Sequence, residues 1–175
     1  MAPARREAPI TMRISRARAR SLSVLELQVG ALDARPDVPV VKILVDGAEP
    51  WEDVVPGWQG FHPAEMLGAD SPLLPDDLGR RVAIYRCTCA QAGCGVVAPV
   101  VMPSPDGRRV SWVDARDFTG VFDSPLATTA PTTEGRCWDV PDLHFDRAQY
   151  LAEIRRATGC ARPVRETPSC AGAGP

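Results

Sequence analysis

The chain has 175 residues, 45% of them hydrophobic and 24% charged, and a formal net charge of −2. This length fits one globular domain with tails and disfavours two full domains. The small net charge gives no general electrostatic reason to bind nucleic acid or an anionic membrane, so we expect neither as a partner. The 18 prolines predict short elements joined by long Pro-rich loops.

The two ends of the chain differ from its middle. Residues 1–20 are rich in Arg and Ala, and residues 160–175 carry few large apolar side chains. We therefore predict a disordered basic arm and a disordered tail around a single domain at residues 21–159, with Met12 as a second candidate for the start. The N-terminus lacks the apolar run of a secretory signal, and no stretch approaches a membrane span, so we expect a cytoplasmic protein. In that compartment the six cysteines favour metal binding or free thiols over disulfides.

The first predicted elements are two strands. Residues 22–29 alternate in part between apolar and polar side chains, and residues 40–45 are a β-branched run closed by Asp46 and Gly47. Residues 48–78 follow with five prolines, and they predict an irregular connection that contains one short helix from Pro63 to Leu67. We expect the connection to be pinned to the domain by three aromatic side chains, Trp51, Trp58 and Phe61.

Three further strands are predicted in the middle of the chain. Residues 82–85 form the first, and residues 96–102 and 110–113 flank a turn-rich segment, which indicates a β-hairpin. Pro99 cannot donate a ladder hydrogen bond, so we expect it at a sheet edge or a bulge. Residues 128–133 have the composition of an exposed loop.

The last predicted element is a helix that begins at Arg147. Asp146 can accept hydrogen bonds at its N-terminus, Gln149 stands at the capping-box position, and Gly159 supplies a stop. One face carries the residues expected to pack across the sheet, which are Tyr150, Leu151, Ile154 and Ala157. The fold class is therefore α+β, mainly antiparallel sheet with one C-terminal helix packed on it.

The sharpest local signal is a cluster of three cysteines within eight residues. Cys87 and Cys89 are one residue apart, so in a continuing strand they point the same way, and Gly93 permits a turn that returns Cys94 toward them. Three such thiolates can bind zinc and leave a fourth position for another residue or water. The candidate metal ligands are Cys87, Cys89, Cys94 and Cys137, with His62, His144 or water as alternatives in the fourth position.

Two other interpretations of the cluster stay open. The cysteines can be inert residues that shape a loop, or Cys87 or Cys94 can act as a nucleophile or redox group. Arg86 could lower the pKa of Cys87, but a neighbouring residue on a strand points to the opposite face. We expect His62 and His144 to pack or form hydrogen bonds rather than to catalyse.

Charged residues elsewhere carry weaker signals. We interpret Asp114, Arg116 and Asp117 as a turn with a local salt bridge. Five arginines could gather near one sheet edge, but they lack an aromatic stacking platform, so we do not expect the protein to bind nucleic acid. These residues are Arg80, Arg81, Arg86, Arg108 and Arg109.

Three segments resemble a family of uncharacterised bacterial proteins. Residues 85–94 are similar to its Cys-x-Cys-Gly-x-x-Gly-Cys loop, residues 110–112 to its Val-x-Trp strand, and residues 145–150 to its Phe-Asp-x-x-Gln-Tyr helix start. The resemblance spans roughly residues 40–157 and implies domain limits rather than an activity. This chain departs from the family at Ala90, where Gly is usual, and at Gly95, where a bulky aromatic is common.

The leading hypothesis is a small soluble binding or accessory protein whose cysteine loop holds a structural zinc ion. We expect a protein partner. One alternative is a thiol-dependent enzyme or redox protein that uses Cys87 or Cys94. Another is a partner-binding module of the immunity or regulatory kind, with purely structural cysteines. The sequence decides neither whether the protein is an enzyme nor its oligomeric state.

Overall fold

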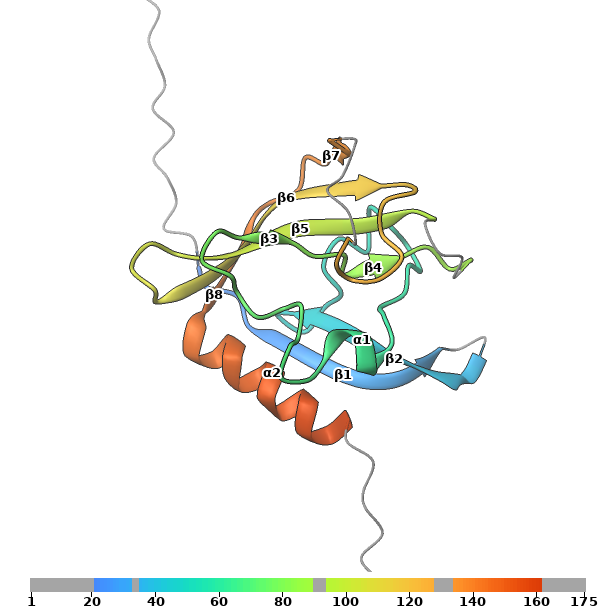
Figure 1. Ribbon diagram of the computed structural model, residues 1–175, viewed down its shortest axis with the longest axis horizontal. Helices are drawn as coiled ribbons and strands as arrows, with labels where there is room; N and C mark the ends of the chain where they lie inside the picture. The colour runs from blue at the N-terminus through green and yellow to red at the C-terminus, as the bar shows by residue number, and fades with distance from the viewer. Residues whose placement is uncertain (1–20, 33–34, 90–93, 128–133, 162–175) are drawn as a thin grey trace, which may run out of the picture.

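A computed structural model describes residues 21–32, 35–89, 94–127 and 134–161 (Figure 1). The predicted arm at residues 1–20, the loop at 128–133, the turn at Gly93 and most of the predicted tail lie outside the described residues.

The strands pair in antiparallel fashion, as predicted, but they form two sheets. The smaller sheet pairs β1 (Leu25–Leu32) with β2 (Arg35–Val45). The larger sheet has the order β3-β5-β6-β7, with β4 beside β5 and β8 beside β6. Its strands are β3 (Arg80–Arg81), β4 (Tyr85–Arg86), β5 (Val96–Pro103), β6 (Arg109–Phe118), β7 (Arg136–Cys137) and β8 (Leu143–Asp146). Strands β5 and β6 are the predicted hairpin.

Backbone hydrogen bonds connect the two sheets on both sides of the core. On one side, the Val41 N–H of β2 donates to the Phe61 carbonyl at 2.8 Å, and Gln59 exchanges two bonds with Arg86 of β4. On the other side, the Ser23 N–H donates to the His144 carbonyl of β8 at 2.7 Å. The strands therefore surround a shared core in a barrel-like arrangement (Figure 1).

The core is built around Trp112, which is fully buried on β6. Its ring lies edge-on to Phe145, with the centroids 5.3 Å apart, and Trp51 approaches it at 6.4 Å. Trp58 is partly buried and Phe61 is fully buried against the same cluster. The prediction that these three aromatics pin the Pro-rich connection is confirmed, as is the short helix α1 (Pro63–Met66).

The predicted strand at residues 82–85 is interrupted. Val82 to Ile84 are fully buried between β3 and β4 without belonging to either strand, although the Val82 and Ile84 N–H groups still bond to the Pro99 and Val97 carbonyls of β5. The interruption lies opposite Pro99, where the register between β5 and β6 shifts. Proline has no N–H to donate on the side where the Pro99 carbonyl accepts the Val82 N–H, so the ladder between this segment and β5 is interrupted. The register shift against β6 at the same residue agrees with the expected bulge.

The helix α2 (Arg147–Ala161) covers one side of the domain. Of the four residues predicted on its packing face, Tyr150, Ile154 and Ala157 are buried and Leu151 is partly buried against the core. Asp146 caps the helix by accepting the Gln149 N–H at 2.9 Å. Two details of the prediction are wrong. The Gln149 side chain bonds to β1 instead of returning to the cap, and Gly159 lies inside the helix. Glycine ends a helix where it adopts a positive φ, and Gly159 is not among the glycines that do so here.

Side chains of α2 occupy the outer edge of β1, where a further strand would pair. Gln149 accepts from the Leu25 N–H and donates to the Leu25 carbonyl. One turn along, Glu153 accepts from the Leu27 N–H at 2.6 Å, and Arg156 donates to the Leu27 carbonyl at 2.6 Å. The helix thereby satisfies edge groups that would otherwise be left unpaired.

Candidate metal centre

Three thiols meet where β4 ends and β5 begins. The Sγ atoms of Cys87, Cys89 and Cys94 all lie within 4.8 Å of one another. Cys87 and Cys94 are half-buried, and Cys89 is exposed. The structure thus brings together the three cysteines that the sequence places in one cluster.

The sheet explains why these thiols converge. Tyr85 and Arg86 pair with Val97 and Val96, and the ladder extends by one bond as the Cys87 N–H donates to the Gly95 carbonyl at 2.9 Å. Cys94 precedes this last bonded pair, so the two strand ends hold Cys87 and Cys94 side by side. The Gly93 turn itself lies outside the described residues.

A tryptophan from the Pro-rich connection supports the base of the loop. A Cβ on Gly95 would lie only 2.9 Å from Cη2 of Trp58. Any side chain larger than glycine at position 95 would therefore displace the Trp58 ring. Gln59, next to Trp58, also contacts the site, because its Nε2 donates to the Cys87 carbonyl at 3.5 Å.

The donor set fits a thiolate-binding metal ion. Zinc binds cysteine sulfur at about 2.3 Å, so the sulfurs of a tetrahedral site are about 3.8 Å apart. Separations of up to 4.8 Å need only a small contraction to reach that geometry. Burial, followed by hydrogen bonds with Cys89 and Cys94, raises the pKa of Cys87 to about 12. A raised pKa favours the neutral thiol, and binding to a metal ion would remove its proton.

Arg86 does not activate the neighbouring thiol. Its guanidinium carbon lies 5.1 Å from the centroid of the Phe61 ring, over the ring face. The alternation of side chains along β4 separates it from Cys87, as expected.

Cys137 lies apart from this cluster. It sits on β7, and its sulfur lies 3.9 Å from Oδ1 of Asp114 and 3.7 Å from the Trp138 carbonyl. Strands β5 and β6 stand between β4 and β7 in the sheet. Within the described part of the chain, the group of mutually close ligand atoms contains the three loop cysteines and no fourth residue.

Both histidines have structural contacts. Nδ1 of His62 accepts the Ala64 N–H at 3.1 Å and forms a capping box with Glu65 at the start of α1. Nδ1 of His144 lies 2.8 Å from the Ser111 hydroxyl across the β6–β8 pair. These contacts agree with the expectation that both histidines pack or hydrogen-bond.

The charged residues after Trp112 belong to β6 and not to a turn. Asp114 has φ +50°, and its carboxylate bonds to Arg81 and to Arg116, while Asp117 pairs with Arg136. The expected salt bridges are therefore present, but on a distorted strand. Burial alone would raise the pKa of Asp114, but the hydrogen bonds from the two arginines outweigh it and hold that pKa below its usual range.

Several of the arginines considered for nucleic-acid binding are used within the protein. Arg80 donates to the Leu74 carbonyl, Arg81 to the Ala98 and Asp114 carbonyls, and Arg86 stacks on Phe61. These contacts hold the β3–β4 segment against its neighbours.

Trp58 and Gln59 are the parts of the site that the sequence did not reveal. They are 28 or more residues before Cys87 or Gly95, and no local pattern links them to the cysteines. The only available signal was the expectation that Trp58 is anchored in the domain.

Comparison of the chain with models of protein families, with curated proteins and with solved structures found no match. Of the features that resemble the bacterial family, the structure supports only the presence of a cysteine-rich loop. No helix among the described residues is both long and apolar enough to span a membrane.

Proposed function

We propose that Cys87, Cys89 and Cys94 hold a structural zinc ion that fixes the loop between β4 and β5 of a small binding or accessory protein. The convergence of the three sulfurs carries the proposal, because a loop that places three thiols within 4.8 Å of one another has the donor set that zinc prefers. The zinc would join two strand ends whose backbone ladder stops at Cys87. In this role the metal stabilises the fold and performs no reaction.

The fourth position of the zinc would be filled by water or by a residue that joins the site from outside the described segments. The sequence predicted Cys137 as the fourth ligand, but Cys137 would have to leave its contacts with Asp114 and Trp138 to reach the loop. A protein partner and a cytoplasmic location remain part of the proposal.

Metal analysis of single-cysteine variants tests this proposal. Untagged protein purified without added zinc should contain about one equivalent, and Cys89→Ser should lose it together with at least about 5 °C of the Tm. Cys87→Ser and Cys94→Ser should behave in the same way. Cys160→Ser is the matched control, because Cys160 lies on α2 outside the cluster, and it should keep the zinc.

Three other results would point elsewhere. Loss of zinc in Cys137→Ser would make Cys137 the fourth ligand. Zinc-free wild-type protein in which one thiol reacts much faster than the others would support a thiol-dependent enzyme. Protein that contains no zinc and tolerates serine at all three positions would leave the cysteines purely structural.

A further inference from the structure

The outer edge of β1 is covered by α2 over only part of its length. Leu25 and Leu27 present their backbone groups to this edge, where Gln149, Glu153 and Arg156 bond to them. Because backbone groups alternate along an antiparallel strand, Val29 and Ala31 present theirs to the same edge. No hydrogen bond from the described part of the chain reaches those groups, and both residues are exposed, Val29 by 42%.

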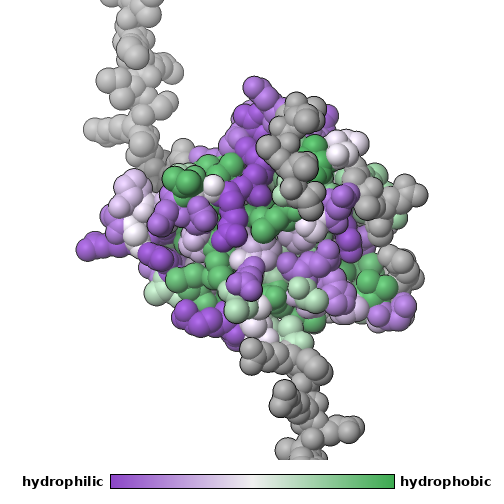
Figure 2. Space-filling model, viewed as in Figure 1, coloured by the Kyte–Doolittle hydropathy of each residue, from purple (hydrophilic) through white to green (hydrophobic). Residues whose placement is uncertain are grey.

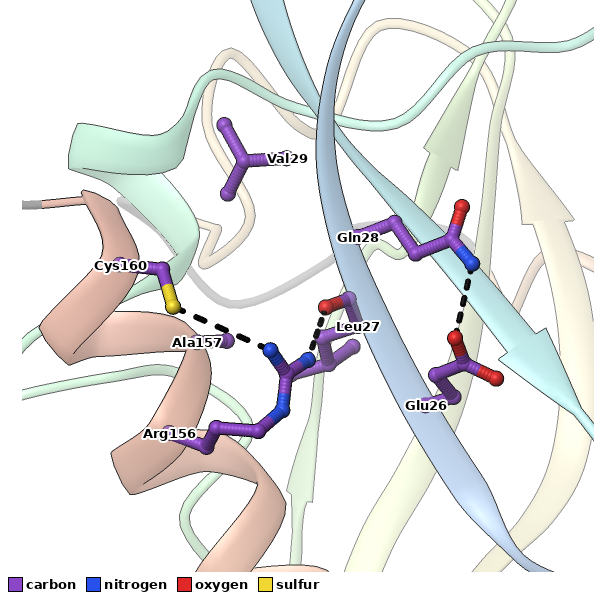
Figure 3. Close-up of a pocket in the computed structure, with 7 residues that line it drawn as sticks. All are labelled: Glu26, Leu27, Gln28, Val29, Arg156, Ala157 and Cys160. Atoms are coloured by element: carbon purple, nitrogen blue, oxygen red, sulfur yellow. Dashed lines mark hydrogen bonds between the residues drawn. The ribbon is translucent and has the colours of Figure 1, made fainter.

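A cavity of about 540 Å³ opens where the helix stops covering the strand (Figure 3). Val29 and Leu27 line it from β1, and Arg156, Ala157 and Cys160 line it from α2. The Arg156 guanidinium bonds to the Leu27 carbonyl at 2.6 Å and lies 3.9 Å from the Cys160 sulfur.

A second cavity, of about 500 Å³, adjoins the same stretch of strand. It extends from residues 28–32 of β1 to Trp58, Tyr85 and Thr88, and so reaches the cysteine loop. Gln28 and Val29 line both cavities, and Figure 3 shows their side chains on opposite sides of β1. An open strand edge with space beside alternate side chains is the arrangement used for strand addition.

We propose that the edge of β1 at Val29 and Ala31 binds an extended segment of a partner protein as an added strand. The inference rests on the proposed binding role but not on the zinc ion. Backbone hydrogen bonds to Val29 and Ala31 supply the pairing, and side chains of the segment enter the two cavities.

The charges around the edge select a basic segment. Glu26 and Arg156 line the first cavity, and Glu49, Glu52 and Lys42 line the second. Arg156 is paired with Glu153 and Lys42 with Glu49, so the carboxylates of these residues outnumber the cations around the edge. Lysine or arginine in the segment would complement these carboxylates, whereas a second copy of this chain would bring the same acids together. Hydrophobic and hydrophilic residues are interspersed on the face shown in Figure 2, so we assign the recognition to the strand edge rather than to a flat apolar patch.

Peptide selection on a backbone variant tests the inference. The full-length protein is used to select from a displayed library of linear peptides of about ten residues, which is long enough to pair with the edge. Val29→Pro removes one outward N–H without touching the β1–β2 ladder, and proline is tolerated on edge strands. The matched control is Val29→Thr, which changes the side chain but keeps the N–H.

Selected peptides should carry basic residues, bind the wild type and the Val29→Thr variant alike, and lose about tenfold in affinity for Val29→Pro. Circular dichroism of Val29→Pro checks that it is folded. The inference is overturned if the library gives no binders, or if the selected peptides bind Val29→Pro with the same affinity as the wild type. A concentration-dependent dimer that Val29→Pro abolishes also overturns it, because the occupant is then a second copy. Zinc content, measured on the same samples, reports separately on the metal proposal.

Discussion

Tyr150 is the residue at which the helix, the larger sheet and the Pro-rich connection meet. Its hydroxyl accepts a hydrogen bond from Nε1 of Trp112 at 3.0 Å and donates one to the Leu73 carbonyl at 2.9 Å. All of these groups are buried, so water cannot replace a missing partner. Burial raises the pKa of Tyr150 above its usual value, so the hydroxyl keeps the proton that it donates.

The Tyr150→Phe substitution removes only one oxygen atom, but it should lower the free energy of unfolding substantially. It leaves both the Trp112 N–H and the Leu73 carbonyl without a partner, and we expect a loss of about 2 kcal/mol in the free energy of unfolding. Tyr85→Phe is the matched control, because the Tyr85 hydroxyl makes one bond, to the Ile43 carbonyl. It should lose about 1 kcal/mol in the same urea titration. Equal losses in the two variants would mean that the shared hydroxyl of Tyr150 has no special role.

At the scale of elements, α2 is joined to β1 by side-chain hydrogen bonds as well as by packing. Glu153 accepts both the Leu27 N–H and the Arg156 guanidinium, and Arg156 in turn bonds to the Leu27 carbonyl. The hydrogen bond from Arg156 lowers the pKa of Glu153, and burial raises it. The Leu27 N–H lowers it further, so the two hydrogen bonds outweigh burial and hold the pKa below its usual range. A carboxyl with a lowered pKa stabilises the fold only while it is ionised.

The Glu153→Gln variant should therefore lose stability in a pH-dependent way. Above the unfolded-state pKa of about 4.3 the wild type should be more stable by about 1 kcal/mol, a modest value because Arg156 is half exposed. As the pH falls through the folded-state pKa, the wild type loses this advantage and the two curves should converge. Urea titrations at pH 7 and pH 3 measure the difference, with Asp77→Asn as an exposed control. A difference that is unchanged at pH 3 would contradict the assigned role of the carboxylate.

At the scale of the whole molecule, the bonds at Val41, Gln59 and Ser23 make the two sheets one structural unit. The core side chains come from both sheets, with Leu27 and Ile43 from the smaller one and Trp112 from the larger one. A domain joined in this way should unfold in a single cooperative transition.

A destabilising substitution in the smaller sheet should thus lower the stability of the larger sheet by the same amount. Leu27→Ala removes a side chain that is only 1% exposed, and it should cost about 3 kcal/mol. The tryptophan fluorescence transition should shift as far as the far-UV circular dichroism transition, although β1 and β2 contain no tryptophan. A fluorescence midpoint that stays in place while the dichroism midpoint moves would show that the two sheets unfold separately.

Features encoded within a few residues could be predicted from the sequence. The β-branched run before Asp46, the hairpin around the turn after Pro103 and the cap at Asp146 each depend on neighbours in the chain. The three-thiol cluster belongs with them, because its members span eight residues and adjoin one pair of strands. Pro99 indicated an irregularity in the sheet for an equally local reason, because proline has no N–H to donate.

The sequence by itself thus determined the strand pairs β1–β2 and β5–β6, the helix start and the grouping of the loop cysteines, but not the short strands β3, β7 and β8. Only the tertiary structure decided what these elements meet. Gln149 bonds to Leu25, 124 residues away, rather than to its own cap, and Trp58 packs against Gly95. Cys137 lies across two strands from the cluster for the same reason. Strand order and helix placement follow from burying one shared core, and that packing sets distances between residues that no local pattern relates.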